Sequence, residues 1–324
     1  MTSSSHRILQ IARLPLPALN TDLSSAYDVV NLAEQGDKAA FLAEHGASFD
    51  AVVTSAALGL KADVIAALPN LKVVSSFGVG YDALDLPALQ ARGIPVGYTP
   101  GVLNECVADL AFALLMDVSR AVSACDRFVR RGDWSRGGFP LQTKVSGKRV
   151  GIVGMGRIGQ AVAQRAAGFD MEVAYHNRRP AEGSSLRYVD SLVELARWCD
   201  FLVLTVSGGA DTRHLIDAGV LEALGPKGFL INVARGTVVD EAALVSALAD
   251  KRIAGAGLDV FDKEPAVPEA LFALDNVVLT AHVASATWET RRAMGDLVLD
   301  NLSMFFEGGQ VKVAVPGTQP AATA

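Results

Sequence analysis

The length, composition and charge of the chain exclude several classes of protein. Its 324 residues are 50% hydrophobic and 20% charged, which is too apolar for a disordered chain and long enough for two domains. The net charge of −6 gives no basic surface for nucleic acid, no apolar run reaches the roughly 18 residues of a membrane helix, and the three cysteines lack metal-ligand spacing. We therefore expect a metal-free cytoplasmic protein with neither nucleic acid nor membrane as a partner.

From residue 6 to residue 99 the chain alternates between short β-rich runs and helical segments. Strands are expected at residues 7–11, 29–32, 51–54, 73–77 and 95–98, and helices at 38–44, 61–68 and 86–92. This alternation is typical of a parallel sheet with helices on its faces. The sequence therefore predicts a doubly wound N-terminal lobe.

Two glycines enclose one valine directly after the strand at 73–77, in Gly78-Val79-Gly80. Ligands of open α/β sheets gather at the carboxyl ends of the strands. We expect the backbone N–H groups of Val79 and Gly80 to hold a small carboxylate. An ordinary turn is the competing interpretation.

A helix is expected after Thr99-Pro100-Gly101. Asn104 is its expected N-cap, and apolar residues recur at helical spacing from Val107 to Val118. Residues 130–144 are polar and rich in glycine, which predicts a connecting loop.

The second lobe opens with a strand, a glycine turn and a helix. The strand pattern is Val150 to Val153, the turn is Gly154-Met155-Gly156-Arg157-Ile158-Gly159, and an alanine-rich segment follows. Glycine permits a tight turn, close approach of the backbone to a pyrophosphate, and packing of the helix on the strand. A purely structural turn can have the same letters, but the position between strand and helix favours a dinucleotide site.

Six strands are expected in the second lobe, at residues 149–153, 172–176, 201–206, 229–233, 254–260 and 277–280. Six parallel strands in two halves make a dinucleotide-binding fold. A long helix over residues 287–306 can return the chain to the first lobe, and the small polar tail from Gly317 is expected to fray.

The turn after the second strand of this lobe carries Asn177, Arg178 and Arg179, with no acidic residue from Val173 to Ala181. An acid here binds the ribose 2′-hydroxyl of NAD, whereas arginine accommodates the 2′-phosphate of NADP. Paired guanidinium groups match a phosphate, which a carboxylate would repel. We expect NADP (NADPH), with NAD as the weaker alternative; two solvated surface charges are the competing interpretation.

Three polar residues follow successive late strands of the second lobe. Arg235, Glu264 and His282 should therefore emerge at the carboxyl edge of the sheet. Reduction of a ketone by hydride needs a cation to bind and polarise the substrate, an acid to protonate its oxygen, and a partner that keeps this acid protonated. Arg235, His282 and Glu264 can fill these roles in that order. Taken singly, each also fits a surface or edge residue.

Together these segments resemble the D-2-hydroxyacid dehydrogenase family. The resemblance rests on Gly154 to Gly159, Asn232-Val233-Ala234-Arg235-Gly236, Gly257-Leu258-Asp259-Val260-Phe261, Glu264-Pro265 and His282-Val283-Ala284-Ser285, and it extends to Phe77-Gly78-Val79-Gly80-Tyr81-Asp82 and Thr99-Pro100-Gly101. Arg178 and Arg179, with Trp134 and Trp288, make the chain most similar to NADPH-preferring glyoxylate, hydroxypyruvate and hydroxyphenylpyruvate reductases.

The resemblance implies an α/β protein of two doubly wound parallel-sheet lobes. A Rossmann cofactor domain (residues 100–287) would be inserted in a flavodoxin-like substrate-binding domain (residues 1–99 and 288–324). It also implies an active site in the cleft and a homodimer formed through the cofactor domain.

The resemblance further implies a catalytic trio of Arg235, Glu264 and His282. The implied substrate contacts are Val79, Gly80, Arg235, His282 and Ser285. The implied cofactor contacts are Gly154, Met155, Gly156, Arg157, Ile158, Gly159, Asn177, Arg178, Arg179, Ser207, Val233, Ala234, Arg235, Asp259, His282 and Ala284. Two positions depart from the family: Ala284 replaces the common glycine, and Asn104 stands where many relatives have another polar residue.

The implied activity is NADPH-dependent reduction of a small 2-oxo acid to its D-2-hydroxy acid. Glyoxylate, hydroxypyruvate and aryl pyruvates are the candidate substrates. Within the family, an NAD-dependent dehydrogenase of another substrate class, such as phosphoglycerate, is the alternative. Outside enzymes, the alternative is a cofactor-sensing corepressor.

Overall fold

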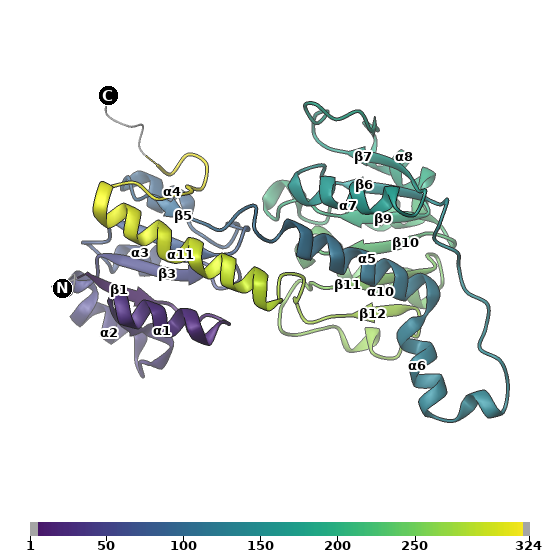
Figure 1. Ribbon diagram of the computed structural model, residues 1–324, viewed down its shortest axis with the longest axis horizontal. Helices are drawn as coiled ribbons and strands as arrows, with labels where there is room; N and C mark the ends of the chain where they lie inside the picture. The colour runs from purple at the N-terminus through teal and green to yellow at the C-terminus, as the bar shows by residue number, and fades with distance from the viewer. Residues whose placement is uncertain (1–5, 320–324) are drawn as a thin grey trace. The chain divides into compact units, whose positions relative to one another are not determined.

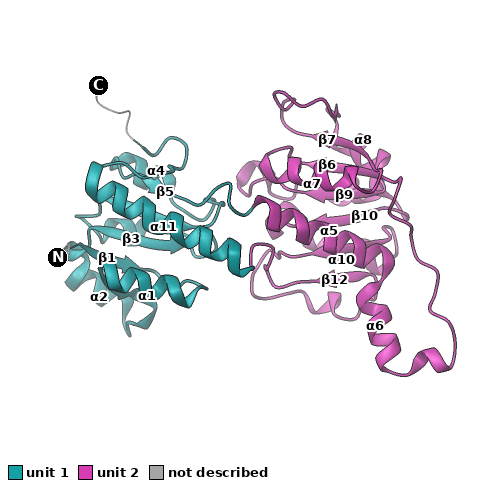
Figure 2. Ribbon diagram, viewed as in Figure 1, with its two compact units in different colours: residues 1–103, 287–324 teal, residues 104–286 magenta. Residues whose placement is uncertain are grey.

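The computed structural model describes residues 6–319 and divides into two compact units (Figure 2). Unit 1 runs to Leu103 and resumes at Thr287, and unit 2 is Asn104–Ala286. Each unit has one parallel β-sheet, which confirms the prediction of two parallel-sheet lobes. Among the described helices, none is both long enough and apolar enough to cross a membrane.

The sheet of unit 1 has the strand order β2-β1-β3-β4-β5, which is the flavodoxin-like order. Its strands, all predicted from the sequence, are β1 (Arg7–Gln10), β2 (Asp28–Asn31), β3 (Ala51–Ser55), β4 (Val73–Phe77) and β5 (Val96–Gly97). Buried apolar residues of β1, β3 and β4, including Leu9, Val52 and Val74, form the core of this unit.

The helices of unit 1 are α1 (Pro17–Ala26), α2 (Lys38–His45), α3 (Ala62–Ala66), α4 (Leu86–Ala91) and α11 (Trp288–Gly308). All but α1 were predicted. Helix α1 buries only Leu19 and Leu23 among Ser, Thr and Asn residues, so its apolar stripe is too sparse to detect. Helix α11 packs on β4, where Ser75 Oγ donates a hydrogen bond to the Val298 carbonyl (3.1 Å).

Helix α11 and the segment after it are hydrogen-bonded to β5 and the residues that follow this strand. Asn301 is fully buried; its amide nitrogen donates to the Tyr98 carbonyl (3.2 Å) and its oxygen accepts from Val313 N–H (2.9 Å). Thr318 is buried, and its Oγ1 accepts from Val96 N–H (3.1 Å). The expectation of a frayed tail from Gly317 is therefore wrong at Thr318, because its hydroxyl completes a hydrogen bond of the sheet edge; residues 320–324 lie outside the described residues.

The sheet of unit 2 has the order β12-β11-β10-β9-β6-β7-β8. Its strands are β6 (Arg149–Val153), β7 (Glu172–His176), β8 (Arg187–Tyr188), β9 (Phe201–Leu204), β10 (Phe229–Asn232), β11 (Gly255–Leu258) and β12 (Val277–Leu279). Counted from β6, this is the dinucleotide-binding order with one added strand. The prediction of six strands is wrong, because the sheet has a seventh strand, β8. This strand has only two residues at the sheet edge, so the sequence shows no periodicity there.

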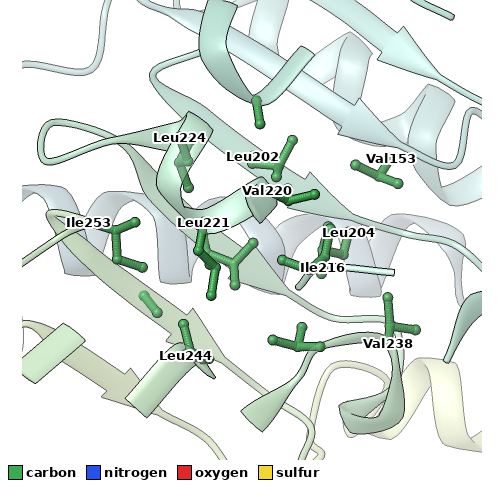
Figure 3. Close-up of a cluster of buried hydrophobic side chains, with 14 of the residues drawn as sticks. Val153, Leu202, Leu204, Ile216, Val220, Leu221, Leu224, Val238, Leu244 and Ile253 are labelled. Atoms are coloured by element: carbon green, nitrogen blue, oxygen red, sulfur yellow. The ribbon is translucent and has the colours of Figure 1, made fainter. Parts of the chain in front are cut away.

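The helices of unit 2 are α5 (Asn104–Arg120), α6 (Val122–Arg130), α7 (Arg157–Ala167), α8 (Leu192–Trp198), α9 (Ala218–Leu224) and α10 (Glu241–Ala249). Figure 3 shows one core cluster, in which Leu202 and Leu204 of β9 pack with Val220 and Leu221 of α9. Asn104 is the first helical residue of α5 rather than its N-cap. Helix α6 was not predicted, since it buries no residue.

Candidate active site

The glycine turn lies between β6 and α7, as predicted. Gly154 has a positive φ of 104°, and a side chain at Gly159 would lie 2.3 Å from the Gly154 carbonyl oxygen. Gly156 is the N-cap of α7 without a side-chain cap, and nothing lies within 4 Å of the position of a Cβ there. Gly154 and Gly159 thus serve packing, whereas Gly156 leaves open space at a helix N-terminus, where the backbone N–H groups can hold a pyrophosphate.

The turn after β7 is joined to the glycine turn. Asn177 Oδ1 accepts a hydrogen bond from Met155 N–H at 2.7 Å. Beside it, Arg178 is paired with Asp211 at 3.4 Å, and the two side chains are 88% and 79% exposed. Asp211 lies in the short 3₁₀ helix η4 (Ala210–Thr212), after β9. Sequence reasoning missed this acid because it follows a different strand from the one that precedes Arg178. The Arg178–Asp211 ion pair is exposed and therefore weak, so a phosphate can replace Asp211 as the partner of Arg178.

The segment after β10 is held by an asparagine. Asn232 Oδ1 accepts from Ala234 N–H (3.0 Å), and its amide nitrogen donates to the Arg235 carbonyl (3.0 Å). Gly236 is packed so tightly on Phe261 that a Cβ would lie 1.8 Å from its carbonyl carbon. These contacts fix the backbone from which the Arg235 side chain extends.

His282 and Glu264 form the central pair of the site. The imidazole Nδ1 lies 2.7 Å from Glu264 Oε2, while Glu264 Oε1 accepts from Phe261 N–H at 3.0 Å. Burial alone would raise the pKa of Glu264, but the hydrogen bonds from His282 and Phe261 and the positive charges of His282 and Arg235 hold this pKa below its ordinary value. Glu264 is therefore a carboxylate, Nδ1 carries a hydrogen toward it, and Nε2 is the ring nitrogen that faces away.

The loop that carries His282 is organised around the buried Asp259. Its Oδ1 accepts from the Thr280 hydroxyl (2.7 Å) and Val283 N–H (2.8 Å), and its Oδ2 accepts from Ala284 N–H (3.0 Å). Its carbonyl oxygen also accepts from His282 N–H (2.8 Å). Asp259 is 0% exposed, so the structure shows it as a positioning group; the cofactor contact implied for it stays a prediction.

Other predicted site residues lie at the same strand ends. Ser207 follows β9 and is exposed, Val233 follows β10 and is buried, and Ser285 follows the His282 loop and is half-buried. Ala284 is buried and, unlike His282, does not have a positive φ. The methyl group at the departure from the family pattern therefore causes no backbone strain.

The predicted carboxylate cradle lies in unit 1, after β4. Val79 and Gly80 are half-buried, and within residues 6–319 neither backbone N–H has a protein hydrogen-bond partner. Two donors in successive peptide units can bind a small anion. Arg235, Glu264, His282 and Asp259 belong to unit 2.

The parallel sheets, the glycine turn and the paired histidine at the carboxyl edge define a dinucleotide-dependent oxidoreductase. Residues 112–284 match the family described as "D-isomer specific 2-hydroxyacid dehydrogenase, NAD binding domain". The chain belongs to this family, which confirms the resemblance seen in its sequence.

Several characterised relatives cover most of the chain. It is 48% identical to hydroxyphenylpyruvate reductase of Plectranthus scutellarioides over 290 residues. These residues cover 90% of this chain and 93% of the relative. It is 49% identical over 255 residues to 2-ketogluconate reductase of Gluconobacter oxydans, covering 79% and 82%. The NADPH-dependent glyoxylate/hydroxypyruvate reductase of Sinorhizobium meliloti, solved with NADP and malonate, has a TM-score of 0.93 and 44% identity, covering 99% and 100%.

Proposed function

We propose that the protein reduces a small 2-oxo acid to its D-2-hydroxy acid with NADPH. The observation that carries the proposal is the pairing of His282 Nδ1 with the Glu264 carboxylate, at the sheet edge that also holds the glycine turn. In the imidazolium form of His282, the pairing of Nδ1 with the carboxylate leaves the Nε2–H group as the proton donor. The reductases that this chain resembles act on hydroxyphenylpyruvate, glyoxylate, hydroxypyruvate and 2-ketogluconate, as their names state.

Each domain would have its own task. We propose residues 1–99 and 288–324 as the substrate-binding domain and residues 100–287 as the cofactor domain. This division is supported by the two compact units, because unit 2 covers Asn104–Ala286 and unit 1 covers the residues on either side of it. The glycine turn with Met155, Arg157 and Ile158 would hold the pyrophosphate, and Ser207, Val233, Ala234, Asp259 and Ala284 would surround the rest of the cofactor.

The proposed chemistry assigns one role to each group. When bound, the reduced nicotinamide supplies a hydride to the carbonyl carbon. The Arg235 guanidinium binds the substrate and polarises its carbonyl, while the Val79 and Gly80 N–H groups hold its carboxylate and Ser285 contacts it. His282 Nε2 gives its proton to the carbonyl oxygen as the C=O bond becomes C–OH, and the ring is left neutral.

The preference for NADPH rests on the turn after β7. Arg178 and Arg179 are exposed there, beside the Asn177 side chain that holds the glycine turn. A 2′-phosphate would replace the exposed Asp211 as the partner of Arg178 and form a charge-assisted contact. The S. meliloti structure with NADP supports this assignment.

A substrate and cofactor panel tests the proposal. Glyoxylate, hydroxypyruvate, hydroxyphenylpyruvate and 2-ketogluconate are each supplied with NADPH or NADH, and initial rates are followed by loss of absorbance of the reduced cofactor. We expect at least one 2-oxo acid to be reduced faster with NADPH, with a D-configured product on chiral chromatography wherever the product is chiral. A clear NADH preference contradicts the cofactor assignment, and no oxidation with any acid contradicts the function.

We also propose a homodimer formed through the cofactor domain. Figure 1 shows α6 and the loop that follows it extending away from the body of unit 2. Exposed apolar residues lie along this arm and near it, at Val122, Val129, Trp134, Leu141 and Phe272. A second copy would cover such an apolar surface. Light scattering after size exclusion should give twice the chain mass; a monomer at micromolar concentration would exclude a stable dimer.

A further inference from the structure

Thr99 and Gly78 are joined by two reciprocal hydrogen bonds. Gly78 N–H donates to Thr99 Oγ1 at 3.0 Å, and Thr99 N–H donates to the Gly78 carbonyl oxygen at 2.9 Å. Both residues are buried, and Thr99 is 0% exposed. Both polar groups of the Gly78 backbone are therefore held by the same residue, which follows the adjacent strand β5.

This arrangement decides the direction of the Val79 N–H. The Gly78 carbonyl and the Val79 N–H belong to one planar trans peptide unit, so they point in opposite directions. Because Thr99 holds the carbonyl, the Val79 N–H points away from Thr99. It has no protein partner among the described residues.

Gly78 cannot fix this turn by itself. Its φ of 143° lies in a region that only glycine occupies readily, and a Cβ there would lie 2.5 Å from the Ala56 side chain. Glycine has the greatest backbone freedom of any residue, so a turn that must hold an anion with N–H groups needs an external restraint. The Thr99 hydroxyl is the side-chain group that supplies it.

We propose that Thr99 is a positioning residue of the substrate carboxylate site. Its hydroxyl accepts the Gly78 N–H and thereby keeps the Gly78 carbonyl on the Thr99 N–H, so that the Val79 N–H stays directed, with that of Gly80, at the carboxylate of the 2-oxo acid. This inference rests on the proposed function. Thr99 itself would contact neither substrate nor cofactor.

The test compares Thr99→Val, which removes the hydroxyl at nearly constant volume, with Thr99→Ser, which retains it. Thr318→Val is the matched control, because the buried Thr318 Oγ1 also accepts a strand N–H in unit 1, that of Val96 at 3.1 Å. Steady-state kinetics give KM for the 2-oxo acid and for NADPH, and kcat. Inhibition by malonate measures carboxylate binding without turnover, and thermal unfolding measures stability.

We expect Thr99→Val to raise KM for the 2-oxo acid and the inhibition constant of malonate by about tenfold, the value of one ordinary hydrogen bond. The KM for NADPH stays within twofold, Thr99→Ser restores the substrate KM, and Thr318→Val lowers the unfolding temperature without changing KM. If Thr99→Val does not fold, Thr99→Ala carries the same expectation.

An unchanged substrate KM in folded Thr99→Val overturns the inference and leaves the proposed function standing. An equal rise in KM for Thr318→Val also overturns it, because the effect would then be general loosening of unit 1. A wild-type enzyme that reduces no 2-oxo acid overturns both proposals, and this outcome is visible before any variant is made.

Discussion

His282 has a left-handed backbone conformation, with φ of 53°. This conformation costs a non-glycine residue about 1–3 kcal/mol and persists only where the surroundings enforce it. Asp259 enforces it here, because its carboxylate binds the N–H groups of Val283 and Ala284 and its carbonyl binds that of His282. The imidazole is thereby presented to Glu264 before any substrate arrives, which is the preorganisation that general acid catalysis requires.

The charge of Glu264 should determine the pH dependence of the reaction. The pKa of Glu264 lies below its ordinary value, so the residue is ionised throughout the neutral range and its charge holds the Nδ1 side of His282. Only as the pH falls through this lowered pKa does Glu264 take up a proton and lose that charge. The kcat/KM of the wild type should therefore fall on the acid side of its pH profile. Glu264→Gln has no carboxyl group to titrate, so it should lack this acid limb and have a kcat/KM lower by about tenfold or more at neutral pH, as for the loss of a charge-assisted hydrogen bond.

Glu241→Gln is the matched control for this profile. Glu241 Oε1 accepts from Asp262 N–H at 3.0 Å, as Glu264 Oε1 does from Phe261 N–H, but no contact with His282 accompanies it. Its pH profile should coincide with that of the wild type. Coincident profiles for Glu264→Gln and the wild type would show that the carboxylate does not act on the proton donor.

At the scale of the element, the glycines of the turn between β6 and α7 have two different roles. Gly154 and Gly159 are enclosed by protein, while Gly156 faces open space. Its φ of −86° is also one that alanine adopts easily. A substitution at Gly156 therefore tests ligand binding separately from folding.

Gly156→Ala should weaken cofactor binding with little effect on the fold. A methyl group at the N-terminus of α7 would occupy the space through which a pyrophosphate approaches the backbone. We expect KM for NADPH to rise by about tenfold or more, as for the loss of one charge-assisted hydrogen bond, with about 1 kcal/mol or less of lost stability.

Gly168→Ala, at the other end of α7, should change neither quantity strongly, since a Cβ there meets only the Arg165 carbonyl at 3.4 Å. Gly159→Ala should destabilise the protein, because its Cβ would lie 2.3 Å from the Gly154 carbonyl oxygen. If Gly156→Ala binds NADPH as tightly as the wild type does, the cofactor does not pass over this turn.

At the scale of the whole molecule, the strands were predictable because parallel strands buried on both faces form continuous apolar runs. The edge strand β8 and helices α1 and α6 lack such a signal, since they bury few residues or none. The sequence from Gly317 is small and polar, which predicts a frayed tail, yet Thr318 is bound to β5 by a contact that no local pattern reveals.

The same distinction holds for the candidate site. The positions of Arg235, Glu264 and His282 were predictable because each follows a strand, and the carboxyl ends of parallel strands meet at one edge. Their catalytic roles stay predictions. Asp211 and Thr99 were not assigned roles, because their contacts with Arg178 and Gly78 join loops whose sequences have no periodicity. The hydrogen bonds that the Asp259 carboxylate accepts from Val283 and Ala284 depend on the direction of its side chain, which strand order alone does not determine.

Replacement of His282 by alanine tests the central claim most directly. Turnover of the best 2-oxo acid is measured with saturating NADPH, beside the dissociation constant of NADPH from its fluorescence. Because general acid catalysis contributes about 10²–10⁴-fold, kcat should fall by at least a hundredfold while the NADPH constant stays within about twofold. A variant that turns over at close to the wild-type rate would show that His282 is not the proton donor.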